Sequence, residues 1–167
     1  MLLYHPYKDS NHCTFRLLSI MLKLDNEILL EKLKVADFFY LFPHFLKEIK
    51  PWPRDLSAFK KHLKDFDKPY ENTPNKKKLF FDMDNVQNQA LMQLASRGIL
   101  SVERLKKGFV KLDLSKLPEP ILLQINNDDF NNGSILKVLV EGLCNSQWSG
   151  SGGLKMRSGL MEYKYDE

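Results

Sequence analysis

The sequence predicts an α-rich α+β fold, and three observations support this prediction. Apolar residues recur at the three-and-four spacing of a buried helix face through most of the 167 residues. Strand-like alternation of apolar and polar residues is confined to short stretches, of which residues 109–114 are the clearest. Glycines and prolines separate these segments at short intervals. We therefore expect many helices and a small number of short strands.

The most regular helical pattern lies near the middle of the chain, over residues 82–100. Asp82 or Asp84 can cap its first turn, and Gly98 is the expected left-handed residue after its last turn. The apolar stripe comprises Met83, Val86, Ala90, Leu91 and Leu94, and the polar face comprises Gln87, Gln89, Gln93 and Arg97. The remaining elements are placed relative to this helix.

Strand character on both sides of the central helix completes the outline of a winged-helix-like domain with a small β-wing. Residues 78–81 lead into the helix and residues 109–114 follow it. We expect residues 73–167 to form this winged-helix-like part, with C-terminal helices, a Gly–Ser hinge at 149–153 and a docked tail. The tail has a short strand pattern at 154–165.

Residues 1–72 are predicted to form a helical N-terminal part. Ser10 is a suitable N-cap for a first helix and Asp25 for a second. The most apolar segment of the chain, residues 35–42, ends at a proline. A turn-rich connector at 68–75 is the expected boundary between the two parts, unless they form one continuous domain.

A single carboxylate, Asp37, lies within that apolar segment. A buried carboxylate costs several kcal/mol unless it is paired, and Arg16 lies in the apolar set of the first helix. The sequence therefore predicts a structural ion pair between Arg16 and Asp37. The alternative, a catalytic acid, needs a second titrating partner, and the local sequence offers none.

Composition indicates an ordinary globular protein. The hydrophobic and charged fractions are 43% and 28%, and the net charge is +4. No apolar run approaches the roughly 20 residues that cross a bilayer, and the N-terminus lacks a signal-peptide pattern. Cys13 and Cys144 are too far apart in sequence to indicate a disulfide framework or zinc site. We expect a cytoplasmic protein without a membrane partner.

Motifs that carry chemistry are absent from the sequence. It has no phosphate-binding loop, no dinucleotide-binding glycine pattern, no nucleophile elbow and no paired carboxylates at catalytic spacing. The four histidines do not have metal-ligand spacing. Asp82 and Asp84 resemble a cation cluster, but first-turn acidic residues complementing the helix dipole explain them better. We expect no enzyme activity, cofactor, metal or small-molecule substrate.

Two kinds of macromolecular contact remain open. Residues 1–112 carry 20 Lys and Arg against 13 Asp and Glu, so nonspecific contact with DNA phosphates is one candidate. Its candidate residues are Lys76, Lys77, Lys78, Arg97, Lys106 and Lys107. The glutamines of the central helix could face bases or form a solvated face. Protein contact is the other candidate, through Phe38, Phe39, Phe42, Phe45, Tyr163 and Tyr165.

Several stretches together resemble a known family. They are residues 4–18, 35–43, 69–72, 78–81, 86–91, 95–100 and 153–165. In this order they resemble the middle component of bacterial three-component ABC ATPase systems, whose relatives include the small third subunit (LmuC) of Lamassu anti-phage defence. The resemblance implies a non-catalytic adaptor beside an SMC/Rad50-like ATPase and an effector, commonly a nuclease. It implies no active-site residues.

A second hypothesis uses the same fold for a different purpose. A free-standing winged-helix transcriptional regulator would purify as a homodimer and bind duplex DNA with a steep salt dependence. An adaptor would instead co-purify with a large ATPase.

Overall fold

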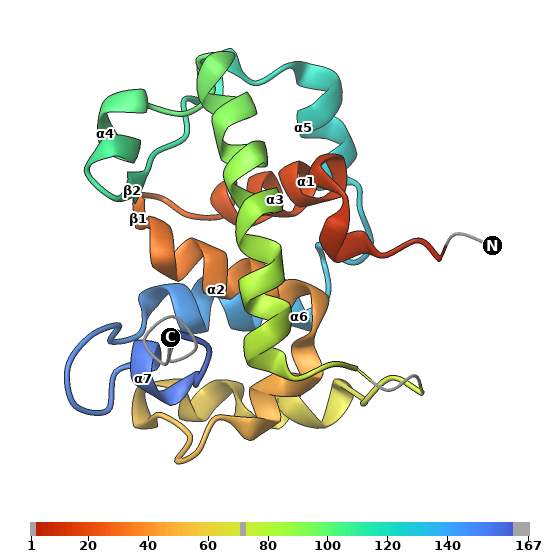
Figure 1. Ribbon diagram of the computed structural model, residues 1–167, viewed down its shortest axis with the longest axis vertical. Coiled ribbons are helices and arrows are strands. Elements are labelled where there is room, and N and C mark those ends of the chain that lie inside the picture. Colours follow the sequence, from red (N-terminus) through yellow and green to blue (C-terminus); the bar gives the residue numbers. More distant parts are fainter. Residues whose placement is uncertain (1–2, 71–72, 162–167) are drawn as a thin grey trace.

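The computed structural model describes residues 3–70 and 73–161, and the chain is mostly helical (Figure 1). The label η marks a 3-10 turn or helix, except for η5, which is a π-helical turn. In chain order the elements are η1 (Pro6–Lys8), α1 (Ser10–Met21), β1 (Ile28–Leu29), α2 (Leu30–Leu41), η2 (Pro43–Glu48), η3 (Arg54–Asp65), α3 (Lys76–Ser96), α4 (Val102–Lys106), β2 (Phe109–Val110), η4 (Leu114–Lys116), α5 (Glu119–Asn126), α6 (Ser134–Lys137), η5 (Val138–Gly142), η6 (Leu143–Asn145) and α7 (Leu154–Arg157).

Helix α3 is the longest element and runs along the molecule, with α1 and α2 packed against it (Figure 1). Its N-cap is Asn75, whose side chain accepts a hydrogen bond from the Lys77 N–H at 2.8 Å. The prediction that residues 78–81 form a strand and that Asp82 or Asp84 caps the helix is therefore wrong. The stripe of α3 continues backwards through Phe80 and Leu79, which are buried, so the helix begins six residues before Asp82.

The predicted end of this helix is confirmed. Gly98 has φ of 74°, which a residue without a Cβ adopts at little cost. The Ile99 N–H donates to the Leu94 carbonyl at 3.0 Å and the Gly98 N–H to the Ala95 carbonyl at 3.0 Å. This is the hydrogen-bond pattern of a Schellman ending.

The sheet has two short antiparallel strands. Ile28 pairs with Val110 and Leu29 with Phe109, and Leu100 and Leu112 form an isolated bridge beside them. The strand in the predicted 109–114 segment thus pairs with the connection between α1 and α2. The prediction that Asp25 caps a second helix is wrong, because α2 begins at Leu30. The α-rich α+β class agrees with the structure, but its strands do not follow the predicted winged-helix outline.

One hydrophobic cluster joins the elements on both sides of the 68–75 connector. Phe38 of α2 lies at its centre, edge-on to Phe80 of α3 at 5.9 Å between ring centroids and stacked on Phe45 at 5.7 Å. Segment α6–η6 adds a layer of buried leucines and valines against η3 and α2. Among the described residues no helix combines the length and apolarity needed to span a membrane.

The last described segment is helical where a strand pattern was expected. The Gly–Ser run at 149–153 forms a closed turn, because the Leu154 N–H donates to the Gln147 carbonyl at 2.9 Å and the Lys155 N–H to the Trp148 carbonyl at 2.9 Å. Helix α7 follows, and Leu160 and Met161 after it are buried. Docking of the tail is therefore observed as far as residue 161.

Candidate functional site

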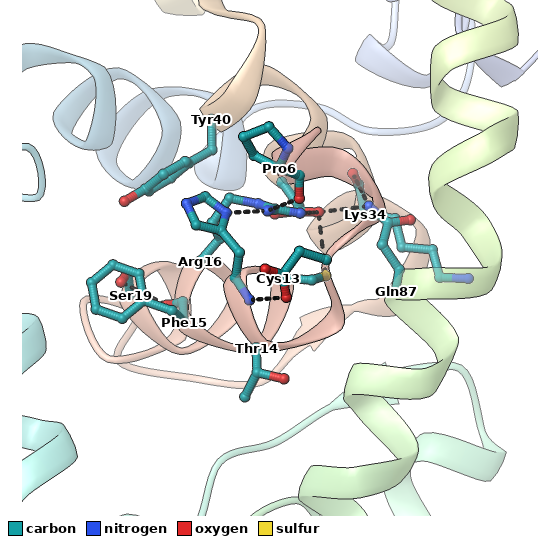
Figure 2. Close-up of polar contacts among 12 residues, drawn as sticks. Pro6, Cys13, Thr14, Phe15, Arg16, Ser19, Lys34, Tyr40 and Gln87 are labelled. Atoms are coloured by element: carbon teal, nitrogen blue, oxygen red, sulfur yellow. Dashed lines mark hydrogen bonds and ion pairs between the residues drawn. The ribbon is translucent and has the colours of Figure 1, made fainter. Parts of the chain in front are cut away.

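The densest group of polar side chains lies inside the molecule, between α1, α2 and α3 (Figure 2). Arg16 and Asp37 form the expected ion pair, with Nε to Oδ1 at 2.6 Å and Nη2 to Oδ2 at 3.1 Å. Both side chains are 0% exposed. The contact is bidentate, the geometry in which guanidinium and carboxylate interact most strongly.

Gln87 of α3 is the third member of this buried cluster. Its Nε2 donates to Asp37 Oδ2 at 2.9 Å and to the Lys34 carbonyl at 3.1 Å. The assignment of Gln87 to the solvated face, or to a base-reading position, is therefore wrong. It lies on the apolar stripe because positions 80, 83, 87, 90 and 94 repeat at three-and-four spacing, and this spacing is visible in the sequence.

The cluster also holds the N-terminal turn η1. Arg16 Nη1 donates to the Pro6 carbonyl at 3.3 Å and lies 2.6 Å from His12 Nδ1. An arginine can only donate, so His12 Nδ1 accepts and the imidazole is neutral in this arrangement. Burial lowers the pKa of His12, and the Arg16 charge lowers it further, against the opposing effect of Asp9 and Asp37.

The electrostatics of the cluster favour structure over reactivity. Burial disfavours the charged Arg16, but the Asp37 carboxylate outweighs it, so the pKa of Arg16 is raised. Burial and the Asp37 charge also raise the pKa of the Cys13 thiol, whose Sγ lies 3.8 Å from Asp37 Oδ2. Cys13 is thus a protonated thiol at neutral pH and a poor nucleophile. The cluster fixes three helices and one turn relative to each other.

A second buried polar group connects the loop before α6 to the same helices. Tyr40 donates its hydroxyl to Asn131 Oδ1 at 2.7 Å, and Asn131 Nδ2 donates to Ser19 Oγ at 3.0 Å. Burial raises the pKa of Tyr40 to about 12, so the phenol remains a neutral donor. The side chains of this group are hydrogen-bonded to each other, whereas in the first cluster Gln87 Oε1 has no hydrogen-bond partner among the described residues.

The six basic residues predicted to contact DNA do not lie in one place. Lys76, Lys77 and Lys78 begin α3, and Arg97 caps its other end, about 30 Å away along the axis at about 1.5 Å per residue. Acidic residues already pair with Lys76 (Glu48, 3.2 Å), Lys78 (Asp82, 3.1 Å) and Lys107 (Glu103, 3.5 Å). Lys106 is exposed in the last turn of α4. The structure therefore divides the predicted set between two ends of the molecule.

The predicted partner residues are also divided. Phe38, Phe39 and Phe45 are buried in the core, which corrects the expectation that they offer a contact surface. Their aromatic density serves packing between α2, η2 and α3. Phe42 is half-buried at the end of α2. Tyr163 and Tyr165 lie outside the described residues.

Phe42 lines a hollow that the sequence did not indicate. This hollow, which we call the aromatic groove, has a volume of about 650 Å³. It lies between η1, the end of α2 and the residues Asp67, Pro69, Thr73 and Pro74. Its walls include Tyr4, Tyr7, Phe42, Pro69 and Pro74. Tyr4 is 65% exposed. Turn η1, which Arg16 holds, forms one wall of this groove.

Comparison with known proteins gives one finding about identity. No curated protein sequence and no solved structure matches the chain. Residues 2–166, nearly the whole chain, match the family described as ABC-three component (ABC-3C) system Middle Component 5. The chain belongs to this family of middle components.

Proposed function

We propose that this protein is a non-catalytic adaptor that couples an SMC/Rad50-like ATPase to an effector nuclease in bacterial anti-phage or anti-plasmid defence. The observation that carries the proposal is the family match over residues 2–166, since a middle component has other components of its system as partners. The resemblance to the small third subunit of Lamassu defence supports an ATPase and an effector as those partners.

The chemistry of the fold supports an adaptor over an enzyme. Catalysis needs ionisable groups that a substrate can reach. Here the densest polar cluster, around Arg16 and Asp37, is enclosed and its charges are paired with each other. Such an arrangement stabilises one conformation of the chain, which is what a subunit that transmits contacts between partners requires.

Direct DNA contact has a minor place in this proposal. The six predicted basic residues lie at opposite ends of α3, and three of them form ion pairs with Glu48, Asp82 and Glu103, so the six do not form one positive surface. Specific DNA affinity usually rests on several clustered phosphate contacts. We propose that DNA is held mainly by the complex, with nonspecific assistance from this subunit.

Co-expression with the other components of its system tests the proposal. With an affinity tag on this chain and nuclease treatment of the lysate, we expect the ATPase and the effector to co-purify with it. Omitting this chain should separate effector activity from the ATPase, whereas ATP hydrolysis by the ATPase persists. Purification of the chain alone, as a homodimer that binds duplex DNA with steep salt dependence, would instead favour a free-standing regulator.

A further inference from the structure

We infer that the aromatic groove and the basic hollow beside it form one docking site for a peptide segment of another component, in which a group of apolar residues adjoins a group of acidic ones. This inference rests on the proposed adaptor function and specifies the chemistry of one of its contacts. It depends on two adjoining hollows, one lined mainly by apolar side chains and the other by lysines.

The apolar half of the site is the aromatic groove. Tyr7 lies between His5 and Phe42, with ring centroids 5.4 Å and 6.1 Å away. Prolines at positions 6, 43, 69 and 74 line the same space. Aromatic and proline side chains in a hollow present rigid apolar surface, which binds apolar side chains at low entropic cost.

The second half, which we call the basic hollow, has a volume of about 490 Å³ and shares His44, Thr73 and Pro74 with the groove. Its described lining contains four lysines, at positions 47, 68, 76 and 77, and one acidic residue, Glu48, which pairs with Lys76 at 3.2 Å. Lys47 and Lys68 are exposed and form no ion pair within the described part of the chain. A segment that spans both hollows therefore meets a mainly apolar lining, with one carboxylate at Asp67, in the groove and positive charge in the basic hollow.

His44 lies where the two halves meet. It is 9% exposed and packs on Phe45 with ring centroids 4.2 Å apart. Its Nε2 has no hydrogen-bond partner among the described residues, and leaving such a buried polar atom unsatisfied is unfavourable. Burial lowers the pKa of His44, and the charges of Lys68 and Lys47 act in the same direction against Glu48. A carboxylate in the basic hollow would offset this positive potential.

The site is held in shape before any partner arrives. Arg16 fixes the Pro6 carbonyl from inside, and Tyr4 donates its hydroxyl to Asp9 at 2.8 Å. Asn75 caps α3 at the edge of the basic hollow, so the positive end of the helix dipole adds to the lysine charges. A preformed site avoids the entropic cost of ordering its walls on binding.

A peptide explains the two halves better than other occupants. Nucleic acid would use the lysines but leaves the prolines and the half-buried Phe42 without a role. A second copy bound through the same face would bring the same lysine-rich patch and no added acidic group, because both sides of a two-fold interface are the same surface. An apolar and acidic segment satisfies both halves at once.

The test compares charge reversal in the site with the same reversal elsewhere. In the co-expressed, nuclease-treated complex, Lys47→Glu/Lys68→Glu should lower retention of one component by about tenfold. The matched control is Lys60→Glu/Lys61→Glu on η3, which makes the same charge change at two exposed lysines and should retain the component fully. For the apolar half, Tyr4→Ala should reduce retention, and Met92→Ala, at a residue that is 69% exposed on α3, should not.

A photo-crosslinking residue in place of Tyr4 identifies the occupant. We expect a crosslink to a segment of a partner component in which apolar residues adjoin acidic ones. A crosslink to nucleic acid or to a second copy of this chain would overturn the inference. So would full retention by both site variants when the unaltered chain retains its partners. If the unaltered chain retains no component, the proposed adaptor function itself fails, and the two failures are thus distinguishable.

Discussion

The buried cluster and the docking site use the same kinds of side chain in opposite ways. In the cluster, the charge of Arg16 is paired with that of Asp37 and both are enclosed. In the docking site, Lys47 and Lys68 are exposed and form no ion pair within the described part of the chain. The pairing of charges, more than the density of charged residues, therefore distinguishes a structural polar cluster from a surface that can bind a partner.

The largest expected effect tests the structural side of this comparison. Asp37→Ala should lower the free energy of unfolding by about 3–5 kcal/mol, because it leaves the Arg16 charge buried and unpaired. Thermal unfolding should show a fall in Tm of about 10 °C. Asp67→Ala, at an exposed carboxylate of the groove, should change stability by less than about 0.5 kcal/mol. The double variant Arg16→Met/Asp37→Leu should recover most of the lost stability. If Asp37→Ala and the unaltered chain melt at the same temperature, the ion pair does not contribute to the stability of the fold.

Gln87 sharpens the comparison within α3. Gln87→Met should cost about 1–3 kcal/mol, because Asp37 and the Lys34 carbonyl each lose a buried donor. Gln89→Met, two residues along on the exposed face, should lie within about 0.5 kcal/mol of the unaltered chain. Urea unfolding of both variants measures the difference. If the two substitutions cost the same, the position of Gln87 in the cluster has no energetic role.

A pH series tests whether the cluster depends on neutral His12. Its pKa is lowered in the folded chain, so the unfolded chain binds more protons as the pH falls through about 6.5, and the free energy of unfolding decreases on acidification. His12→Asn should lose less stability between pH 7.5 and pH 5.5 than the unaltered chain does. His44→Asn should act in the same direction, because burial also lowers the pKa of His44. An unchanged pH profile in His12→Asn would contradict this account.

The smallest expected effect belongs to the docking site. Lys47→Glu/Lys68→Glu should alter the free energy of unfolding by less than about 0.5 kcal/mol, since both lysines are exposed and without an ion pair in the described residues. Circular dichroism melts of this variant and of Lys60→Glu/Lys61→Glu should therefore coincide. A large destabilisation would show that these lysines stabilise the fold, and it would contradict their assignment to a binding surface.

The structural part of the molecule could be read largely from the sequence. The Arg16–Asp37 pair followed from one carboxylate in an apolar segment and one arginine in an apolar helix face, and Gly98 indicated the end of α3. The errors came from local rules that tertiary packing overrides. Residues 78–81 have strand propensity, but Leu79 and Phe80 are buried as part of a helix that Asn75 caps.

The surface part could not be read in the same way. The aromatic groove joins residues 4–7 and 41–44 with Asp67, Pro69, Thr73 and Pro74, and no periodicity in the sequence indicates that these segments meet. An aromatic-rich stretch such as 38–45 does not reveal which rings are enclosed, and here Phe38, Phe39 and Phe45 are while Phe42 is half-exposed. Burial of an individual ring depends on neighbours that are distant in sequence, so its availability to a partner follows only from the fold.

The hydrogen bond from Arg16 to the Pro6 carbonyl has a mechanical consequence. A pull on a segment seated against η1 would load the Pro6 carbonyl, then the guanidinium, and then Asp37 on α2 and Gln87 on α3. A displacement of η1 would thus reach the long helix through a chain of hydrogen bonds, from 3.3 Å at Pro6 to 2.9 Å at Gln87. The position of η1 is therefore coupled to the positions of α2 and α3 through side chains inside the fold.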